Sequence, residues 1–307
     1  MLDNAHFIDP PLQCIDDPLL KARGVTLQIL RLDLVHPLIS GNKWFKLKHN
    51  LALALSQGHD TVLSYGGAYS NHLVALAAAA KLSGLRSIGV VRGEVSDTSN
   101  YALRFMRAQA MELYPVSRGT YRLKEDDTFK QELRERFGRY FDIPEGGSNA
   151  MGLLGTAEIS RFLKFQSKGG SQHVLVACGT AATLAGILTS LAPGPQVLGV
   201  SVLKGDDTLS PQVSQWLQDA GRDDPCAWSI NHDFHCGGYA KKTPELLRFM
   251  EQFSANTGIP LEPVYTGKML QAFYRLLEQG YFPEGSEVIA IHTGGLVAQE
   301  NVVNIPT

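Results

Sequence analysis

Short apolar segments that end in or beside glycine recur along the chain. Continuous apolar runs of this length are typical of strands that are buried on both faces, as in parallel sheets. Five such runs are clear, at residues 61–67, 87–93, 173–179, 196–202 and 287–295.

Longer segments with apolar residues at helical spacing separate these runs. One begins at the N-cap candidates Ser70 or Asn71 and ends at Gly84, and another begins at Thr243 and ends at Gly258. Strand followed by helix, repeated, predicts an α/β fold with doubly wound, open, mainly parallel sheets. Two further helices are predicted in residues 180–192 and 268–280.

Sheets of this kind bind ligands at the carboxyl ends of their strands. The loops where a ligand is expected to bind are therefore SYGGAYSNH (residues 64–72), VACGTAATLAG (176–186) and AIHTGG (290–295).

Composition narrows the class of protein. The 307 residues are 44% hydrophobic and 19% charged, which is ordinary for a globular chain of about two domains. The net charge of −2 gives no reason to expect nucleic acid or an anionic membrane as a partner. Four scattered cysteines without a CxxC pair favour a reducing compartment. With an acidic N-terminus and no apolar run there, we expect a cytoplasmic protein that does not span a membrane.

The loop at residues 179–183 places small residues between a strand and a helix. Its backbone N–H groups could approach a phosphate at a helix N-terminus, although a tight turn that needs small residues for packing has the same sequence. Ser70, Asn71 and His72 could likewise grip an anion or simply cap a helix.

Two other motifs are less specific. HDFHC (residues 232–236) matches no strong zinc spacing, so no metal is expected. Tyr265 and Lys268 lie at a turn that opens a helix, where the tyrosine could donate a proton, stack on a ring, or serve as a core aromatic.

Three lysines lie close together in GNKWFKLK. A solvated helix face would look the same, but Lys43 and Lys46 would share one face of a helix. If Lys43 were partly desolvated, its amine could bond to a carbonyl while Lys46 met a phosphate. Pyridoxal phosphate carries both an aldehyde and a phosphate.

Five motifs resemble, in order and in spacing, the pyridoxal-phosphate enzymes called D-cysteine desulfhydrase and 1-aminocyclopropane-1-carboxylate deaminase. The resemblance extends from about Asp33 to Gly295, nearly the whole chain. The motifs are SGNKWFKLKHNL, SYGGAYSNH, EGGSNAMGLLG, VACGTAATLAG, and EPVYTGK with AIHTGG.

The resemblance implies a role for each matching position. Lys43 would bond to the cofactor aldehyde and move protons at the substrate Cα, while Lys46 would contact the cofactor phosphate. Asn71 would hydrogen-bond the ring hydroxyl of the cofactor, and Thr293 would lie near its pyridine nitrogen. The remaining implied residues are a phosphate cradle (Gly179, Thr180, Ala181, Ala182, Thr183), a substrate-binding loop (Tyr69, Ser70, Asn71, His72, with Ser70 near the reacting carbon) and two active-site tyrosines (Tyr239, Tyr265).

The resemblance also implies an architecture. A large cofactor-binding domain would comprise residues 1–48 and 144–307, with a small βα domain inserted at 49–143, the cofactor in the cleft, and a homodimer as the assembly.

Some positions distinguish the two activities. The deaminases have Glu after the equivalent of Tyr265, where this chain has Thr266; they also read Ser-Asn-Gln and lack the threonine of HTGG. These features favour the desulfhydrases. Phe45 in place of an Arg, and Tyr69 in place of Gln, depart from both groups and point to a different amino-acid substrate.

We therefore expect a lyase that converts a small, D-cysteine-like amino acid to a 2-oxo acid and ammonia with loss of a β-substituent such as sulfide. The alternatives that the sequence leaves open are 1-aminocyclopropane-1-carboxylate deamination, β-replacement by a second substrate, and binding of pyridoxal phosphate or an amino acid without turnover.

Overall fold

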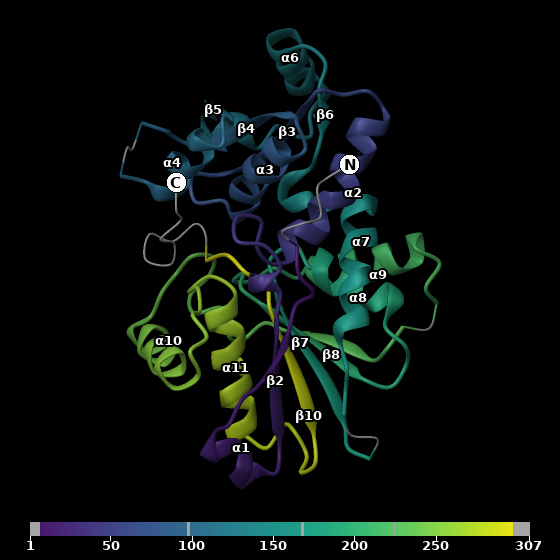
Figure 1. Ribbon diagram of the computed structural model, residues 1–307, viewed down its shortest axis with the longest axis vertical. Helices are drawn as coiled ribbons and strands as arrows, with labels where there is room; N and C mark the ends of the chain where they lie inside the picture. Colours follow the sequence, from purple (N-terminus) through teal and green to yellow (C-terminus); the bar gives the residue numbers. More distant parts are fainter. Residues whose placement is uncertain (1–6, 97–98, 167–168, 224, 297–307) are drawn as a thin grey trace. The chain divides into compact units, whose positions relative to one another are not determined.

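The computed structural model describes residues 7–96, 99–166, 169–223 and 225–296 (Figure 1). The chain divides into two compact units. Of the described residues, the first unit holds 7–8 and 36–155, and the second holds 9–35 and 156–296. The domain limits that the resemblance implies stay a prediction.

The first unit is built on a four-stranded parallel sheet. Its strand order is β5-β4-β3-β6, and the register pairs Ser64 with Gly89. The elements are α2 (Asn42–Ser56), β3 (Thr61–Gly67), α3 (Asn71–Leu82), β4 (Arg86–Arg92), α4 (Tyr101–Ala108), β5 (Glu112–Val116), α5 (Arg118–Tyr121), α6 (Asp127–Phe137), β6 (Phe141–Asp142), η3 (Glu145–Gly147) and α7 (Ala150–Ala157), whose last two residues belong to the second unit.

A glycine-rich segment in the first unit lets α7 approach α2 closely. A Cβ atom at Gly155 would lie 1.7 Å from the carbonyl oxygen of Phe45, and one at Gly152 would lie 1.9 Å from the carbonyl oxygen of Gly147. Such distances leave no room for any side chain. Gly152 and Gly155 are therefore required by packing.

The second unit contains a six-stranded sheet in the order β1-β2-β10-β7-β8-β9. Among the described residues of this sheet, β1 and β2 pair antiparallel and the other neighbouring strands pair parallel. Helices α11 and α8 cover opposite faces of this sheet (Figure 1). The elements are β1 (Leu12–Cys14), α1 (Pro18–Arg23), β2 (Thr26–Arg31), η2 (Leu32–Leu34), η4 (Glu158–Phe162), β7 (Gln172–Cys178), α8 (Ala182–Ser190), β8 (Gln196–Ser201), α9 (Leu209–Asp219), β9 (Trp228–Asn231), α10 (Pro244–Thr257), α11 (Thr266–Glu278) and β10 (Glu287–His292).

The predicted fold class is confirmed: two mainly parallel sheets are each covered by helices. Each of the five predicted strands and four predicted helices is present. The largest difference concerns the run at 287–295, whose strand ends at His292 because Gly294 and Gly295 adopt positive φ angles of 83° and 93°.

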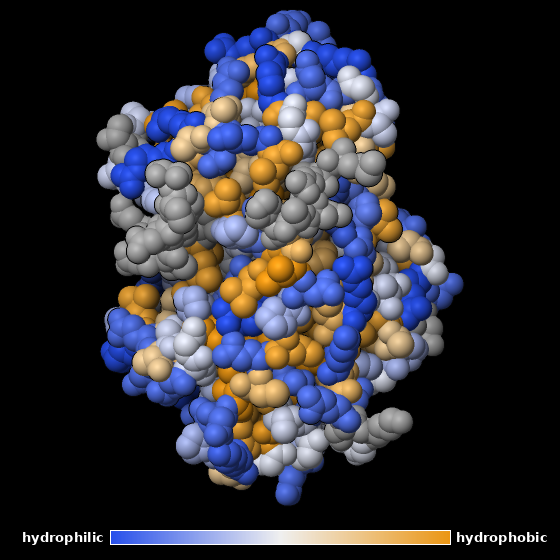
Figure 2. Space-filling model, in the orientation of Figure 1, coloured by the Kyte–Doolittle hydropathy of each residue, from blue (hydrophilic) through white to orange (hydrophobic). Residues whose placement is uncertain are grey.

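No helix in the described part of the chain combines the length and the apolar composition that crossing a bilayer requires. The face shown in Figure 2 mixes hydrophilic and hydrophobic residues.

Candidate active site

Lys43 lies in the first turn of α2. Gly41 precedes the helix as its N-cap with φ 77° and ψ −160°, a conformation open to glycine alone, and the helix begins at Asn42. The Lys43 side chain is half-buried, and its Nζ donates to Asn42 Oδ1 over 2.8 Å. The helix N-terminus carries partial positive charge, which disfavours a second positive charge beside it. The role of Lys43 as the reactive amine stays a prediction.

Lys46 is buried, at 3% exposure, and its turn of helix is fixed by the glycine-rich segment. Asn50 Nδ2 donates to the Lys46 carbonyl over 2.7 Å, and Asn50 and Asn149 exchange two side-chain hydrogen bonds. A Cβ atom at Gly147 would lie 3.2 Å from Lys46 Cβ. A buried lysine held in this way is unlike a solvated basic face, whereas Lys48 is half-exposed.

The loop 64–72 places Ser70 as the N-cap of α3. Ser70 Oγ accepts a hydrogen bond from the Leu73 backbone N–H over 3.2 Å, so the capping interaction considered from the sequence is present. Asn71 begins the helix, and Tyr69 is 68% exposed. The catalytic role of Ser70 stays a prediction.

Gly66 makes room for Ser70, since a Cβ atom at Gly66 would lie 2.5 Å from Ser70 Oγ and 2.6 Å from Ser70 Cβ. We expect Gly66→Ala to displace Ser70 and lower kcat about tenfold to a hundredfold, because small misplacements of reacting groups are costly. Steady-state kinetics beside circular dichroism checks this. A folded Gly66→Ala protein with unchanged kcat would show that Ser70 is only a helix cap.

His72 is paired with Ser64, a residue that the sequence did not single out. Ser64 Oγ lies 2.8 Å from His72 Nε2, and both side chains are buried. Nδ1 of His72 is buried without a hydrogen-bond partner among the described residues. If the Ser64 hydroxyl donates to Nε2, the ring proton resides on Nδ1, and only one buried polar group is left unpaired. Burial first, and then Lys43 and Lys46, lower the pKa of His72 well below its usual value, so the ring offers a neutral N–H donor.

In the second unit, the residues predicted to cradle a phosphate form the start of α8. Ala181 is the N-cap in the left-handed region, at φ 54°, and its side chain makes no capping hydrogen bond. Nonglycine residues in this region are strained and concentrate at functional sites. The N–H groups of a first helical turn lack intrahelical acceptors, which makes this terminus suitable for an anion.

Tyr265 packs against this cradle and is held by a buried carboxylate. A Cβ atom at Gly179 would lie 3.1 Å from Tyr265 Cε1. Glu262 is 1% exposed, and its carboxylate accepts from the backbone N–H groups of Val264, Tyr265 and Thr266 over 2.8, 2.6 and 2.7 Å. Burial raises the pKa of Glu262, while these N–H donors lower it. Glu262 therefore fixes the backbone that carries Tyr265.

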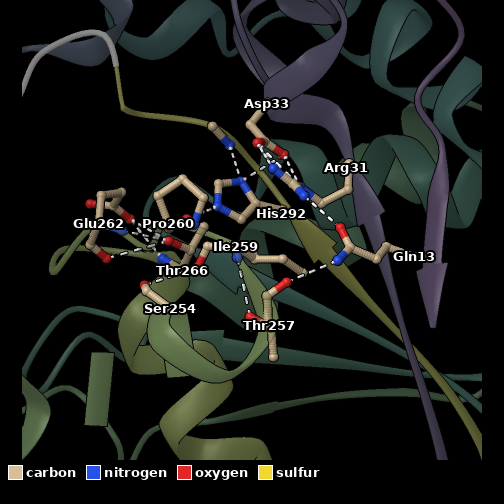
Figure 3. A network of polar contacts seen from close by, with 11 residues as sticks. Gln13, Arg31, Asp33, Ser254, Thr257, Ile259, Pro260, Glu262, Thr266 and His292 are labelled. Carbon is tan, nitrogen blue, oxygen red and sulfur yellow. Dashed lines mark hydrogen bonds and ion pairs between the residues drawn. The ribbon is translucent and has the colours of Figure 1, made fainter. Parts of the chain in front are cut away.

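Thr293 follows a chain of buried polar groups (Figure 3). Arg31 donates to both carboxylate oxygens of Asp33, and Asp33 Oδ1 lies 3.2 Å from His292 Nδ1. His292 Nε2 lies 2.8 Å from the Pro260 carbonyl oxygen, which can only accept. His292 thus joins the strand end before Thr293 to the segment that leads to Tyr265.

Tyr239 is 47% exposed, and its ring meets that of Tyr265 edge-on with centroids 6.2 Å apart. The structure therefore brings the two predicted tyrosines together with Gly179. Of the other predicted residues, Lys43, Lys46 and Tyr69 to His72 belong to the first unit, and Gly179 to Thr183 and Thr293 belong to the second.

Acidification is expected to destabilise the fold through three buried histidines, His72, His173 and His292, because burial lowers the pKa of each. Below about pH 6.5 the unfolded chain binds more protons at these side chains than the folded chain. The free energy of unfolding should therefore be lower at about pH 5.5 than at about pH 7.5, and each of the three histidines should contribute to this loss.

Urea unfolding at the two pH values measures this loss. Glu262 and Asp142, whose pKa values burial raises, act in the opposite direction, so the histidine part is read from a variant. His173 lies outside the site, and the His173→Gln substitution should make the loss smaller. An unchanged loss in that variant would contradict the assignment.

Within the described residues, no group of three or more His, Cys, Asp or Glu side chains is arranged to hold a metal ion. This includes the HDFHC segment.

Known proteins are similar in sequence to this chain over most of its length. A D-cysteine desulfhydrase of Yersinia pestis (strain Pestoides F) is 31% identical over 293 residues, which cover 90% of this chain and 88% of that protein. A Pyrococcus horikoshii protein whose name assigns it provisionally as a 1-aminocyclopropane-1-carboxylate deaminase is 30% identical over 280 residues, which cover 89% and 85%.

Solved structures are also similar to this chain over most of its length. The crystal structure of an ACC deaminase homologue matches with a TM-score of 0.79 at 27% identity and covers 95% of this chain and 90% of that one. The crystal structure of O-ureido-L-serine synthase matches with a TM-score of 0.68 at 16% identity, covering 99% and 96%, which shows the fold alone. Residues 14–294 match the family described as pyridoxal-phosphate dependent enzymes, and the chain belongs to that family.

Proposed function

We propose that the protein is a pyridoxal-phosphate-dependent lyase that acts on a small, D-cysteine-like amino acid. With D-cysteine and water, the products would be pyruvate, ammonia and hydrogen sulfide. The Cα–H and Cβ–S bonds break, and hydrolysis releases the nitrogen as ammonia.

The residues present fit the cofactor. In the second unit, the uncapped N-terminus of α8 with its small side chains suits a phosphate. In the first unit, the half-buried amine of Lys43 suits an aldehyde. When bound, pyridoxal phosphate supplies an electron sink for the substrate Cα.

The chain's own groups would then bind the substrate and move its protons. The Lys43 amine would take the proton from Cα. The neutral N–H of His72 would donate to the substrate carboxylate, with the positive charge of Lys46 near it. Ser70 lies at the start of the same helix.

Thr266 is the residue that favours elimination over ring opening. Its hydroxyl is fully buried against Glu262, and its backbone N–H donates to the Glu262 carboxylate. The deaminases have Glu at this position, so the chain lacks the carboxylate expected to pair with the pyridine nitrogen. Relatives named for each activity are about equally similar, so this position weighs more than overall identity.

A substrate panel tests the proposal. Purified protein supplied with pyridoxal phosphate is incubated with D-cysteine, L-cysteine or 1-aminocyclopropane-1-carboxylate, and sulfide, 2-oxo acid and ammonia are measured. We expect equal amounts of sulfide, pyruvate and ammonia from D-cysteine. Formation of 2-oxobutyrate from the cyclopropane substrate would favour deamination, and turnover that needs an added nucleophile would favour β-replacement. No product from any of them would contradict this substrate class. The homodimer and the cytoplasmic location stay predictions.

A further inference from the structure

Tyr239 lies in a turn, residues 235–240, whose backbone conformation is unusual. Cys236, Gly237, Gly238 and Ala240 have φ angles of 53°, 92°, 121° and 57°. Two of these residues are not glycine, and such conformations persist only where surrounding structure enforces them. Contacts from the surrounding structure must therefore stabilise the backbone of this turn.

Lys268 is the group that contacts it. This lysine is fully buried in the first turn of α11, and its Nζ donates to the carbonyl oxygens of His235 and Gly238, each over 2.8 Å. The Gly238 carbonyl belongs to the peptide that joins Gly238 to Tyr239. One ammonium group thus bridges the carbonyls of residues 235 and 238, which enclose Cys236 and Gly237.

A positive charge at the position of Lys268 is electrostatically unfavourable. It is buried, it lies near a helix N-terminus, and burial lowers its pKa. Its two described hydrogen-bond acceptors are backbone carbonyls, with Glu262 as a nearby opposite charge. An apolar residue would fill this space at lower electrostatic cost, so the contact with the turn is what the lysine provides.

A second side chain of α11 contacts the same turn. Cys236 Sγ lies 3.5 Å from Gln271 Oε1, one helical turn after Lys268. Tyr239, at the end of the turn, meets Tyr265, which immediately precedes α11. The same helix start therefore positions both tyrosines, Tyr265 through Glu262 and Tyr239 through Lys268.

We infer that Lys268 is a positioning residue that holds the 235–240 turn so that the Tyr239 ring faces Tyr265. The effect on turnover rests on the proposed function, whereas the effect on the turn does not.

Hydrogen exchange tests the structural part without any turnover. In Lys268→Met, amides of residues 235–242 should exchange about tenfold faster or more than in the unaltered protein, while β7 and β10 stay protected. The matched control is Lys164→Met, the same substitution at an exposed lysine of the second unit outside the measured segment, which should leave exchange unchanged. If Lys268→Met does not fold, Lys268→Gln, which keeps a donor, should show a smaller increase. Unchanged exchange in residues 235–242 of the folded variant would overturn the inference.

A double-mutant cycle tests whether Lys268 acts through Tyr239. The assay uses the best substrate of the panel. As a single substitution, Lys268→Met should lower kcat about tenfold, whereas the same substitution added to Tyr239→Phe should lower kcat less than about twofold. A purely structural lysine would cost the same in both backgrounds, and that result would overturn the role in positioning Tyr239. If no substrate turns over, the proposed function fails, and the exchange experiment still decides the inference.

Discussion

Replacing Lys43 with alanine is expected to lower kcat by about four orders of magnitude or more, since the residue is proposed both to hold the cofactor and to move the proton at Cα. The fold should remain intact. Alanine is a good helix former, and the hydrogen bond to the adjacent Asn42 that the substitution removes is local. Single-turnover and steady-state assays, with circular dichroism for folding, measure the two effects separately.

Lys48→Ala is the matched control for this experiment. Lys48 lies in the same helix, is half-exposed, and has its Nζ 5.4 Å from the centroid of the Phe45 ring. Its loss should change kcat less than about twofold. Equal activity losses in the two variants would mean that the segment contributes positive charge and no specific amine.

Gly155→Ala is expected to destabilise the protein by about 3 kcal/mol or more, although the residue touches no predicted ligand. The added Cβ atom would lie 1.7 Å from the Phe45 carbonyl oxygen, and main-chain atoms cannot move aside as a side chain can. Helix α2, which carries Lys43 and Lys46, would have to shift. Urea denaturation monitored by circular dichroism gives the free energy of unfolding.

Gly119→Ala provides the comparison, because it is the same substitution in another helix of the first unit. A Cβ atom there would meet only Ser117 Oγ at 3.6 Å, an ordinary contact. That variant should be neutral or slightly more stable, since alanine has the higher helix propensity. Equal stability of Gly155→Ala and Gly119→Ala would contradict the close approach of α7 and α2.

Much of the fold could be predicted from the sequence because local signals agreed with the tertiary structure. The helix expected after Ser70 or Asn71 is α3, with Ser70 as N-cap, and the helix expected between Thr243 and Gly258 is α10 with these two residues as its caps. The missed elements have weak patterns. Strand β5 contains Pro115 and has one buried residue among its five, and α6 buries only Phe129 and Leu133.

The candidate site was predictable only in part. Motifs name residues that are close in sequence, such as Ser70 to His72. The contacts between them are not visible in the motifs: Ser64 contacts His72 from the other end of the same motif, Asp33 contacts His292, and Lys268 contacts the turn that contains Tyr239. No local pattern reveals such pairings, because they form only when strands and helices pack together.

Reduction of the cofactor-loaded protein with borohydride, followed by peptide mass analysis, tests whether Lys43 holds the cofactor. Borohydride converts a lysine–aldehyde linkage to a stable secondary amine. We expect loss of the visible absorption band and a pyridoxyl phosphate mass on the peptide that contains Lys43. A protein that takes up no pyridoxal phosphate, or that carries the label on a different lysine, would contradict this role of Lys43.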